Sequence, residues 1–479
     1  MSNIKHNYLY NLLYQILNLI TPIIVTPYIT RLLGSENLGI HSYYFSVASY
    51  FSIFILLGLN NYGTRVIASC QNDKNERSKN FINIYSFQLF CGILVSAVYI
   101  LFILFVSNCR MISTIFLIYI AGTALDINWL YFGLEQFKTT AVRSITLKLL
   151  SVISVFVFVR TENDLYIYSL IISATYLLSQ LWLWFSISKK IHFVRPSFAE
   201  IKRHIKPNFI LFITVILISL YKIMDKIMLG IMTNYSEVAY YEASEKIIAV
   251  PLALITTLGT VMLPRSTNLT ANKNESKVKK YILISIVFAM FVSTSMCFGI
   301  MGISGEFVPL FYGAGYEKSV PIYLALLPSC VFLAFANVIR TQYLLPNKMD
   351  RPYIISAAIG ASVNIISNLL LIPYFQSVGA AIGTLLAEAA VCIYQSYSVR
   401  KNLEVAKYIK LSIPFVFAGL TMFAGLFYIN IHTGNEVWNI LIKIVIGIVL
   451  YMVIMIVYSL LYKLFTKKNW LPDEIKKIQ

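Results

Sequence analysis

The sequence predicts an all-α integral membrane protein with about fourteen transmembrane helices. Of its 479 residues, 58% are apolar and only 13% are charged, a balance typical of membrane proteins rather than soluble domains. A spanning helix needs about 20 apolar residues, and segments of that length recur along the whole chain. They lie near residues 8–30, 41–63, 81–107, 111–134, 140–160, 164–188, 207–232, 238–263, 279–302, 319–345, 352–373, 379–399, 408–430 and 438–462.

We predict that these helices form two lobes of six, followed by an added helix pair. The N-lobe, with helices 1–6, covers residues 1–190, and a basic cytoplasmic linker covers 191–206. The C-lobe, with helices 7–12, covers 207–403. Helices 13 and 14 lie in 404–465, and a cytoplasmic tail follows in 466–479.

A weak internal repeat supports the division into lobes. At an offset of 200 residues, the segment RLLGSENLGIHSYYFSVASY aligns with IMTNYSEVAYYEASEKIIAV. Helices 1 and 7 are then expected to cross the membrane in the same direction. Parallel repeats of this kind place a substrate site between two lobes.

The basic residues predict the orientation of the chain. Lys and Arg concentrate near the N-terminus, in the even-numbered connections and in the tail, whereas the odd-numbered connections hold only Arg31, Arg110, Arg160 and Lys318. The positive-inside rule therefore places both termini in the cytoplasm. Because basic inner loops also meet anionic lipid, the net charge of +18 needs no nucleic-acid partner, and we expect none.

Helices 7 and 8 each carry three ionisable residues at i, i+3, i+4 spacing, which places them on one helix face. A charge at the bilayer centre costs about 3 kcal/mol, so such residues usually pair or face a polar pathway. Their similar depths predict the ion pairs Asp225–Lys246 and Lys226–Glu245. Such pairs either only join the two helices or also break when substrate or an ion binds. The six residues are Lys222, Asp225, Lys226, Glu242, Glu245 and Lys246.

Other charges inside the apolar segments are mostly basic. Arg31 and Arg65 end helices 1 and 2, and Arg143 and Lys148 lie on helix 5, whereas Glu388 is one of few acidic residues. A cavity with surplus Lys and Arg favours an anionic ligand, and the planar guanidinium of Arg binds phosphate bidentately. The alternative for Arg65 and Arg143 is that these long side chains reach the membrane surface.

Missing motifs and short loops exclude several function classes. There is no GxxxxGK[ST] phosphate loop for ATP hydrolysis, no HExxH or GxSxG, and no histidine spacing that suits a metal. We expect no catalytic residue, no metal and no cofactor. The short outer connections also argue against a membrane-embedded polymerase or glycosyltransferase, so the sequence favours a transporter over an enzyme.

Three segments resemble the Wzx-type polysaccharide flippases of the multidrug/oligosaccharidyl-lipid/polysaccharide (MOP) exporter superfamily. They are DKIMLGIMTNYSEVAYYEASEKIIAVPLALITTLGTVMLPR from Asp225 to Arg265, ITRLLGSENLGIHSY, and NWLYFGLEQFKTTAVRSI. The resemblance implies a two-lobed MATE/MOP-like fold in the bacterial cytoplasmic membrane. It also implies alternating access that carries undecaprenyl-pyrophosphate-linked oligosaccharide repeat units to the outer leaflet for capsule or other surface polysaccharide, with proton or sodium coupling.

On this resemblance, a cationic cavity binds the pyrophosphate, the added helix pair holds the polyprenyl tail, and a smaller set of residues couples or gates transport. Expected partners besides the lipid-linked oligosaccharide are membrane lipid, a polymerase and other polysaccharide-assembly proteins. A teichoic-acid or lipid II precursor flippase, and a MATE-type multidrug or cation antiporter, remain alternatives. The cavity candidates are Lys222, Lys226, Arg31, Arg65, Arg143 and Lys148, and the coupling or gating candidates are Asp225, Glu245, Lys246 and Glu388.

Overall fold

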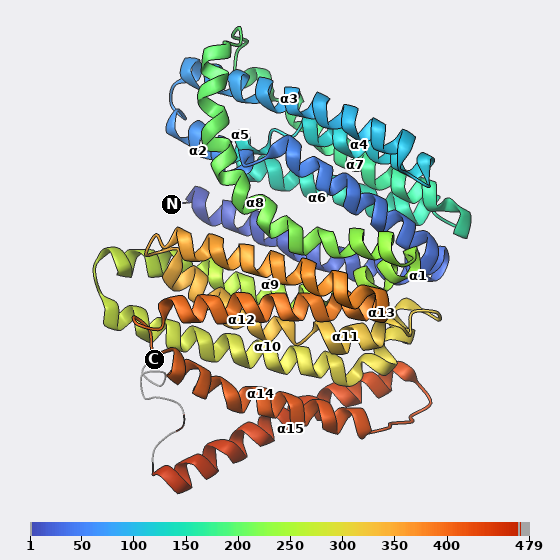
Figure 1. Cartoon of the computed structure of the whole chain (residues 1–479), viewed down its shortest axis with the longest axis vertical. Coiled ribbons are helices and arrows are strands. Elements are labelled where there is room, and N and C mark those ends of the chain that lie inside the picture. Colours follow the sequence, from blue (N-terminus) through green and yellow to red (C-terminus); the bar gives the residue numbers. More distant parts are fainter. Residues whose placement is uncertain (1, 468–469, 471–479) are drawn as a thin grey trace. The chain divides into compact units, whose positions relative to one another are not determined.

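A computed structural model describes residues 2–467 and Trp470, without the side chains of residues 2–16, 19 and 221. Within these residues every regular element is a helix (Figure 1). The predicted all-α fold is therefore confirmed. Most of the predicted tail, 466–479, lies outside the described residues.

The described residues contain twelve helical segments that are long and apolar enough to span a bilayer. Two of them, Ile20–Ser69 and Asp350–Val399, are 50 residues long. Each is interrupted by non-helical geometry: Gly34 has φ 73° and ψ 175°, and Gln376 has φ 52° and ψ −129°. The first segment also contains Leu57, with φ 50°. The twelve spans and these interruptions agree with the approximate number of helices that hydropathy predicts.

Contacts divide the chain into two compact units, Met1–Ala239 and Tyr240–Gln479. In the first unit, α1 packs against α3, α4, α6 and α8, and α8 also contacts α2 and α3. The elements of this unit are α1 (Ser2–Leu56), α2 (Leu59–Ser69), α3 (Lys74–Phe105), α4 (Arg110–Ala124), α5 (Asn128–Gly133), α6 (Phe137–Phe158), the 3₁₀ turn η1 (Glu162–Asp164), α7 (Leu165–Phe185), the 3₁₀ turn η2 (Ile187–Lys189) and α8 (Phe198–Met232).

The second unit is built around α10, which packs against α12, α14 and α15. Helix α9 (Tyr235–Ala271) begins in the first unit and continues into the second. The remaining elements are α10 (Glu275–Tyr312), α11 (Ser319–Leu326), α12 (Ser329–Ile339), the π-helical turn η3 (Arg340–Leu344), α13 (Asp350–Val399), α14 (Val405–Tyr428) and α15 (Glu436–Thr466).

The predicted linker and lobe boundaries can be compared with these units only in part. Residues 191–197 have no regular structure, but the rest of the linker forms the first turns of α8, and Pro207 lies inside that helix. Because α8 packs against α1, the first compact unit ends later than the predicted N-lobe. The division into two lobes and a helix pair stays a prediction.

The internal repeat has a structural counterpart in the positions of the helix breaks. Gly34, which divides α1, aligns at the offset of 200 with Asn234, which lies between the end of α8 and the start of α9. Helix α3 begins at Lys74 and α10 at Glu275. The breaks at Gly34 and Asn234, both in the first unit, are therefore separated by the offset of the repeat.

Three predicted single helices are broken in the structure, and the first of them, 41–63, is divided between α1 and α2 at Leu57 and Gly58. Two further breaks lie later in the chain. The segment 111–134 forms α4 and α5, and 319–345 forms α11, α12 and η3. The break in 319–345 lies at Leu327 and Pro328. Proline is well tolerated where a helix begins, because the N–H that it lacks would have no hydrogen-bond partner within the helix there. In contrast, Pro22, Pro27 and Pro251 lie inside helices without a break at the proline itself.

The break between α4 and α5 is stabilised by Gln88, a fully buried residue of α3. Its Nε2 donates to the carbonyl oxygens of Thr123, Ala124 and Asp126 at 3.3, 3.2 and 2.8 Å, and its Oε1 accepts a hydrogen bond from Trp129 Nε1 at 3.0 Å. Carbonyls freed by a helix break inside a membrane protein need such partners.

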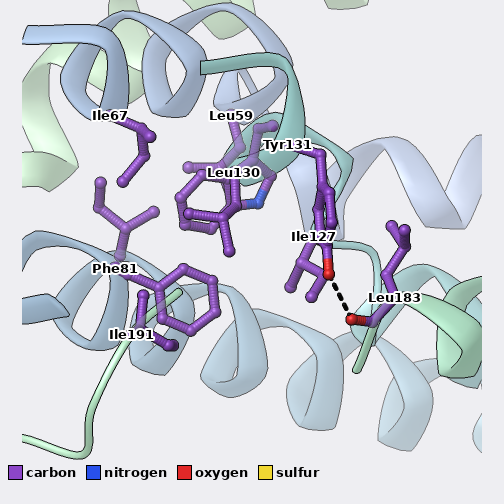
Figure 2. Close-up of a cluster of buried hydrophobic side chains, with 10 residues drawn as sticks. Leu59, Ile67, Phe81, Ile127, Leu130, Tyr131, Leu183 and Ile191 are labelled. Atoms are coloured by element: carbon purple, nitrogen blue, oxygen red, sulfur yellow. Dashed lines mark hydrogen bonds between the residues drawn. The ribbon is translucent and has the colours of Figure 1, made fainter. Parts of the chain in front are cut away.

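Trp129 lies in an apolar core cluster that holds α2, α3, α5 and the end of α7 together. Figure 2 shows this cluster, in which Tyr131 Oη donates to the carbonyl oxygen of Leu183 at 2.5 Å. The rings of Phe81 and Trp129 stack with 5.3 Å between centroids. The cluster thus fixes the α4–α5 break next to the polar residues described below.

Candidate functional site

The three residues of the charged triplet on α8 differ strongly in burial. Asp225 is 1% exposed, Lys226 is partly buried, and Lys222 is exposed. Asp225 shares its side of the helix with the buried Met228 and Leu229. A carboxylate buried in an apolar helix needs a compensating charge or polar partner.

Two residues of the charged triplet on α9 form an ion pair within their own helix. Lys246 Nζ lies 3.1 Å from Glu242 Oε1, with the side chains 32% and 15% exposed. The spacing is i, i+4, which brings the two side chains together on the helix surface. The sequence analysis did not predict this pair. The pairs Asp225–Lys246 and Lys226–Glu245 would join residues of the two units and stay predictions.

The connection between α8 and α9 is packed tightly against α1 within the first unit. A Cβ atom at Gly39 would lie 1.7 Å from the carbonyl oxygen of Tyr235, and one at Gly230 would lie 2.1 Å from the ring of Tyr43. Both positions therefore require glycine. The contact fixes the first residues of α9 against α1.

The candidate cations of α6 are both engaged inside the first unit. Arg143 is 5% exposed, and its Nη1 and Nη2 donate to the carbonyl oxygen of Ser179 at 3.4 Å and to Ser144 Oγ at 3.0 Å. Lys148 Nζ donates to Asn18 Oδ1 at 2.5 Å. Arg143 points into the protein, so the alternative that it reaches the membrane surface is not supported.

Arg143 belongs to a buried polar cluster that the sequence analysis did not identify. Its charge acts on the carboxylate of Asp126, which is 6% exposed and accepts hydrogen bonds from the Asn128 backbone N–H at 2.8 Å and Asn128 Nδ2 at 2.7 Å. Asn128 Nδ2 also lies 3.4 Å from Gln180 Oε1. The sequence signals that could have identified this cluster were the polar residues around Asp126, inside the predicted segment 111–134, and Gln88 and Gln180 inside two other apolar segments.

The remaining candidates lie on separate elements. Arg31, near the break of α1, and Arg65, on α2, are exposed, and Arg31 Nη1 donates to the Pro27 carbonyl oxygen at 3.4 Å. Glu388 on α13 is 9% exposed. A further ion pair, between the buried Lys443 of α15 and Glu306 of α10, was not assigned a role from sequence.

A large apolar groove lies in the second unit between α10, α12, α13 and α14. Its volume is about 950 Å³. Arg400, which follows α13, is one of its few polar lining residues, and its guanidinium carbon lies 3.3 Å from the centre of the Tyr397 ring. The apolar lining includes Met290, Phe298, Phe332, Phe335, Ile393 and Phe417.

Comparison with known proteins identifies the family of this chain. The family model described as "Polysaccharide biosynthesis protein" matches residues 4–270. A protein of Escherichia coli (strain K12) named as an O-antigen transporter is 25% identical over 84% of this chain and 97% of its own length. A protein of Haloferax volcanii named as a low-salt glycan biosynthesis flippase, Agl15, is 22% identical over 39% of each chain.

Solved structures agree on the fold. The lipid II flippase MurJ in an inward closed conformation superposes with a TM-score of 0.72, at 16% identity, over 96% of this chain and 99% of that one. An inward-facing MATE multidrug transporter of the MOP superfamily superposes with a TM-score of 0.64, at 14% identity, over 83% and 96%. The MATE/MOP-like fold and the resemblance to Wzx-type polysaccharide flippases are confirmed. This chain belongs to the polysaccharide biosynthesis protein family of membrane transporters.

Proposed function

We propose that the chain is a flippase that moves an undecaprenyl-pyrophosphate-linked oligosaccharide repeat unit from the inner to the outer leaflet of the bacterial cytoplasmic membrane. The family match over residues 4–270 carries the proposal. The relatives named as an O-antigen transporter and a glycan flippase support this substrate class. The transport changes no covalent bond, so the chain acts as a transporter and not as an enzyme.

The distribution of charge and apolar surface suits such a substrate. A pyrophosphate needs cationic partners in a site of low dielectric constant, and we assign this role to Lys222, Lys226 and Arg143, with Arg31, Arg65 and Lys148 as further candidates. The apolar groove beside α14 has the volume and lining to hold part of a polyprenyl chain.

Transport by alternating access requires a group whose charge or pairing changes during the cycle. The buried Asp225 fits this requirement best, with Glu245, Lys246 and Glu388 as further coupling or gating residues. We propose a proton or sodium ion as the coupling ion. Both termini face the cytoplasm, and the polymerase and other polysaccharide-assembly proteins are the expected partners.

Depletion of the protein in its host tests the proposal. We expect lipid-linked repeat units to build up on the inner leaflet while surface polymer declines, and the wild-type gene to reverse both effects. Accumulation of lipid II or of a teichoic-acid precursor would assign the protein to that substrate instead. Unchanged lipid intermediates together with new sensitivity to cationic drugs would indicate an antiporter and contradict the proposal.

A second set of variants tests the site. Lys222→Ala and Asp225→Asn should each abolish or strongly reduce export while the protein still reaches the membrane. Lys410→Ala, on the exposed surface of α14, is the matched control and should leave export unchanged. Normal export by both site variants would remove these residues from the mechanism.

A further inference from the structure

A polar pocket of about 490 Å³ lies in the second unit, apart from every residue assigned above. It is formed where α9, η3 and α13 end and where α10 begins. On the predicted topology, these connections all lie on the cytoplasmic side. The lining residues are Thr270, Lys273, Asn274, Glu275, Val278, Lys279, Tyr343, Asn347, Lys401 and Asn402.

The charge of this pocket favours an anion. Three lysines, Lys273, Lys279 and Lys401, line it, against one carboxylate, Glu275. The first turn of α10 adds backbone N–H groups and the positive end of the helix dipole, which also attract anions. Clustering of three cations from three segments costs repulsive energy that a bound anion would relieve.

One further feature concerns a polar atom of the pocket lining. Thr270 Oγ1 is buried and has no hydrogen-bond partner among the described residues.

We propose that this pocket binds a phosphate group, with the three lysines as its cationic partners and Thr270, Asn274 and Asn347 as hydrogen-bonding residues. Its volume is in the range of small-molecule sites and exceeds the size of a bare phosphate, so the phosphate is part of a larger molecule or is bound with water. At the ends of membrane helices, the two available sources are an anionic phospholipid headgroup and soluble phosphate.

The ligand test uses two probes on the purified full-length protein in detergent. Radiolabelled inorganic phosphate is measured by equilibrium dialysis, and bound phosphatidylglycerol is counted by native mass spectrometry, with phosphatidylcholine as the neutral comparison. We expect saturable binding of at least one anionic probe, weakened by salt because the contacts are exposed charges. Binding of phosphatidylglycerol alone identifies a lipid headgroup, and binding of inorganic phosphate identifies a soluble source.

The site test compares two triple variants with equal charge change. Lys273→Ala/Lys279→Ala/Lys401→Ala should weaken binding by about tenfold or more, since charge-assisted contacts are lost together. The control Lys410→Ala/Lys463→Ala/Lys467→Ala removes exposed lysines outside the pocket and should bind as the wild type does. Glu275→Gln removes the opposing charge and should tighten binding severalfold.

Amine-reactive labelling gives a readout for the wild-type protein, independent of any folding defect in a variant. The bound probe should protect Lys273, Lys279 and Lys401 from labelling but not Lys410 or Lys463. Equal loss of binding in both triple variants would mean that general surface charge attracts the probe. That result, the absence of saturable binding to either probe, or the absence of protection at the three pocket lysines would overturn the proposal.

Discussion

Gly39 lies against the backbone of Tyr235 so closely that a Cβ atom would come within 1.7 Å of the Tyr235 carbonyl oxygen. The two residues lie far apart in sequence, after the break of α1 and at the start of α9. Only glycine permits this approach, because no rotation of a side chain can move a backbone carbonyl aside. The contact holds the start of α9 against α1.

Gly39→Ala should therefore impair the protein although it adds one methyl group. We expect a stability loss of about 1–3 kcal/mol, as in other overpacked sites, and reduced export. Thermal unfolding in detergent and surface-polysaccharide assays would measure both. Gly305→Ala is the control, because a Cβ there meets no atom of the described residues within 4 Å. Equal behaviour of the two variants would contradict the packing argument.

Asp126 and Arg143 should depend on each other for stability. Both lie in one buried polar cluster, and removal of one charge leaves the opposite charge buried with less compensation, which destabilises the fold. We expect Arg143→Leu to lower the unfolding temperature strongly, and Asp126→Asn/Arg143→Leu to recover part of the loss. A double-mutant cycle of unfolding free energies measures the coupling, and additive effects would show that the two residues act independently.

The same variants separate a structural role of Arg143 from a role in substrate binding. If Arg143 contacts the pyrophosphate, the double variant should regain stability but not export. Recovery of both properties would restrict Arg143 to holding the α4–α5 break. The measurement is export by the double variant, normalised to its amount in the membrane.

Lys443 and Glu306 should respond unequally to substitution. The side chain of Lys443 is 3% exposed and that of Glu306 is 35% exposed. Glu306→Gln leaves an unpaired charge buried, whereas Lys443→Met leaves a half-exposed carboxylate that water can solvate. We predict that Glu306→Gln lowers the unfolding temperature more than Lys443→Met does. The opposite order would mean that packing of the lysine stem matters more than its charge.

The proposed pair between Asp225 and Lys246 can be tested by exchanging the charges. Asp225→Lys and Lys246→Asp should each abolish export, and the combined exchange should restore at least part of it. Because Lys246 also pairs with Glu242, the exchange Glu242→Lys/Lys246→Glu is the comparison. Rescue by this second exchange but not the first would assign Lys246 to α9 alone and leave Asp225 with another partner.

The sequence by itself determined the all-α membrane fold and the approximate number of spans. Length and hydropathy suffice for this, because each spanning helix satisfies its own backbone and needs only about 20 apolar residues. The charged triplets of α8 and α9 were found in the same way, since ionisable residues stand out in an apolar segment. The family resemblance rested on these same segments.

Tertiary structure alone decided how the helices are broken and which polar groups meet. The break at Leu125–Ile127 depends on Gln88, which comes from another helix and binds carbonyls that hydropathy does not register. Arg143 could be judged buried only after α7 and the α4–α5 break were placed beside it. The hydropathy of a segment can be read from its own residues, whereas the pairing of buried polar groups depends on side chains that folding brings together from distant segments.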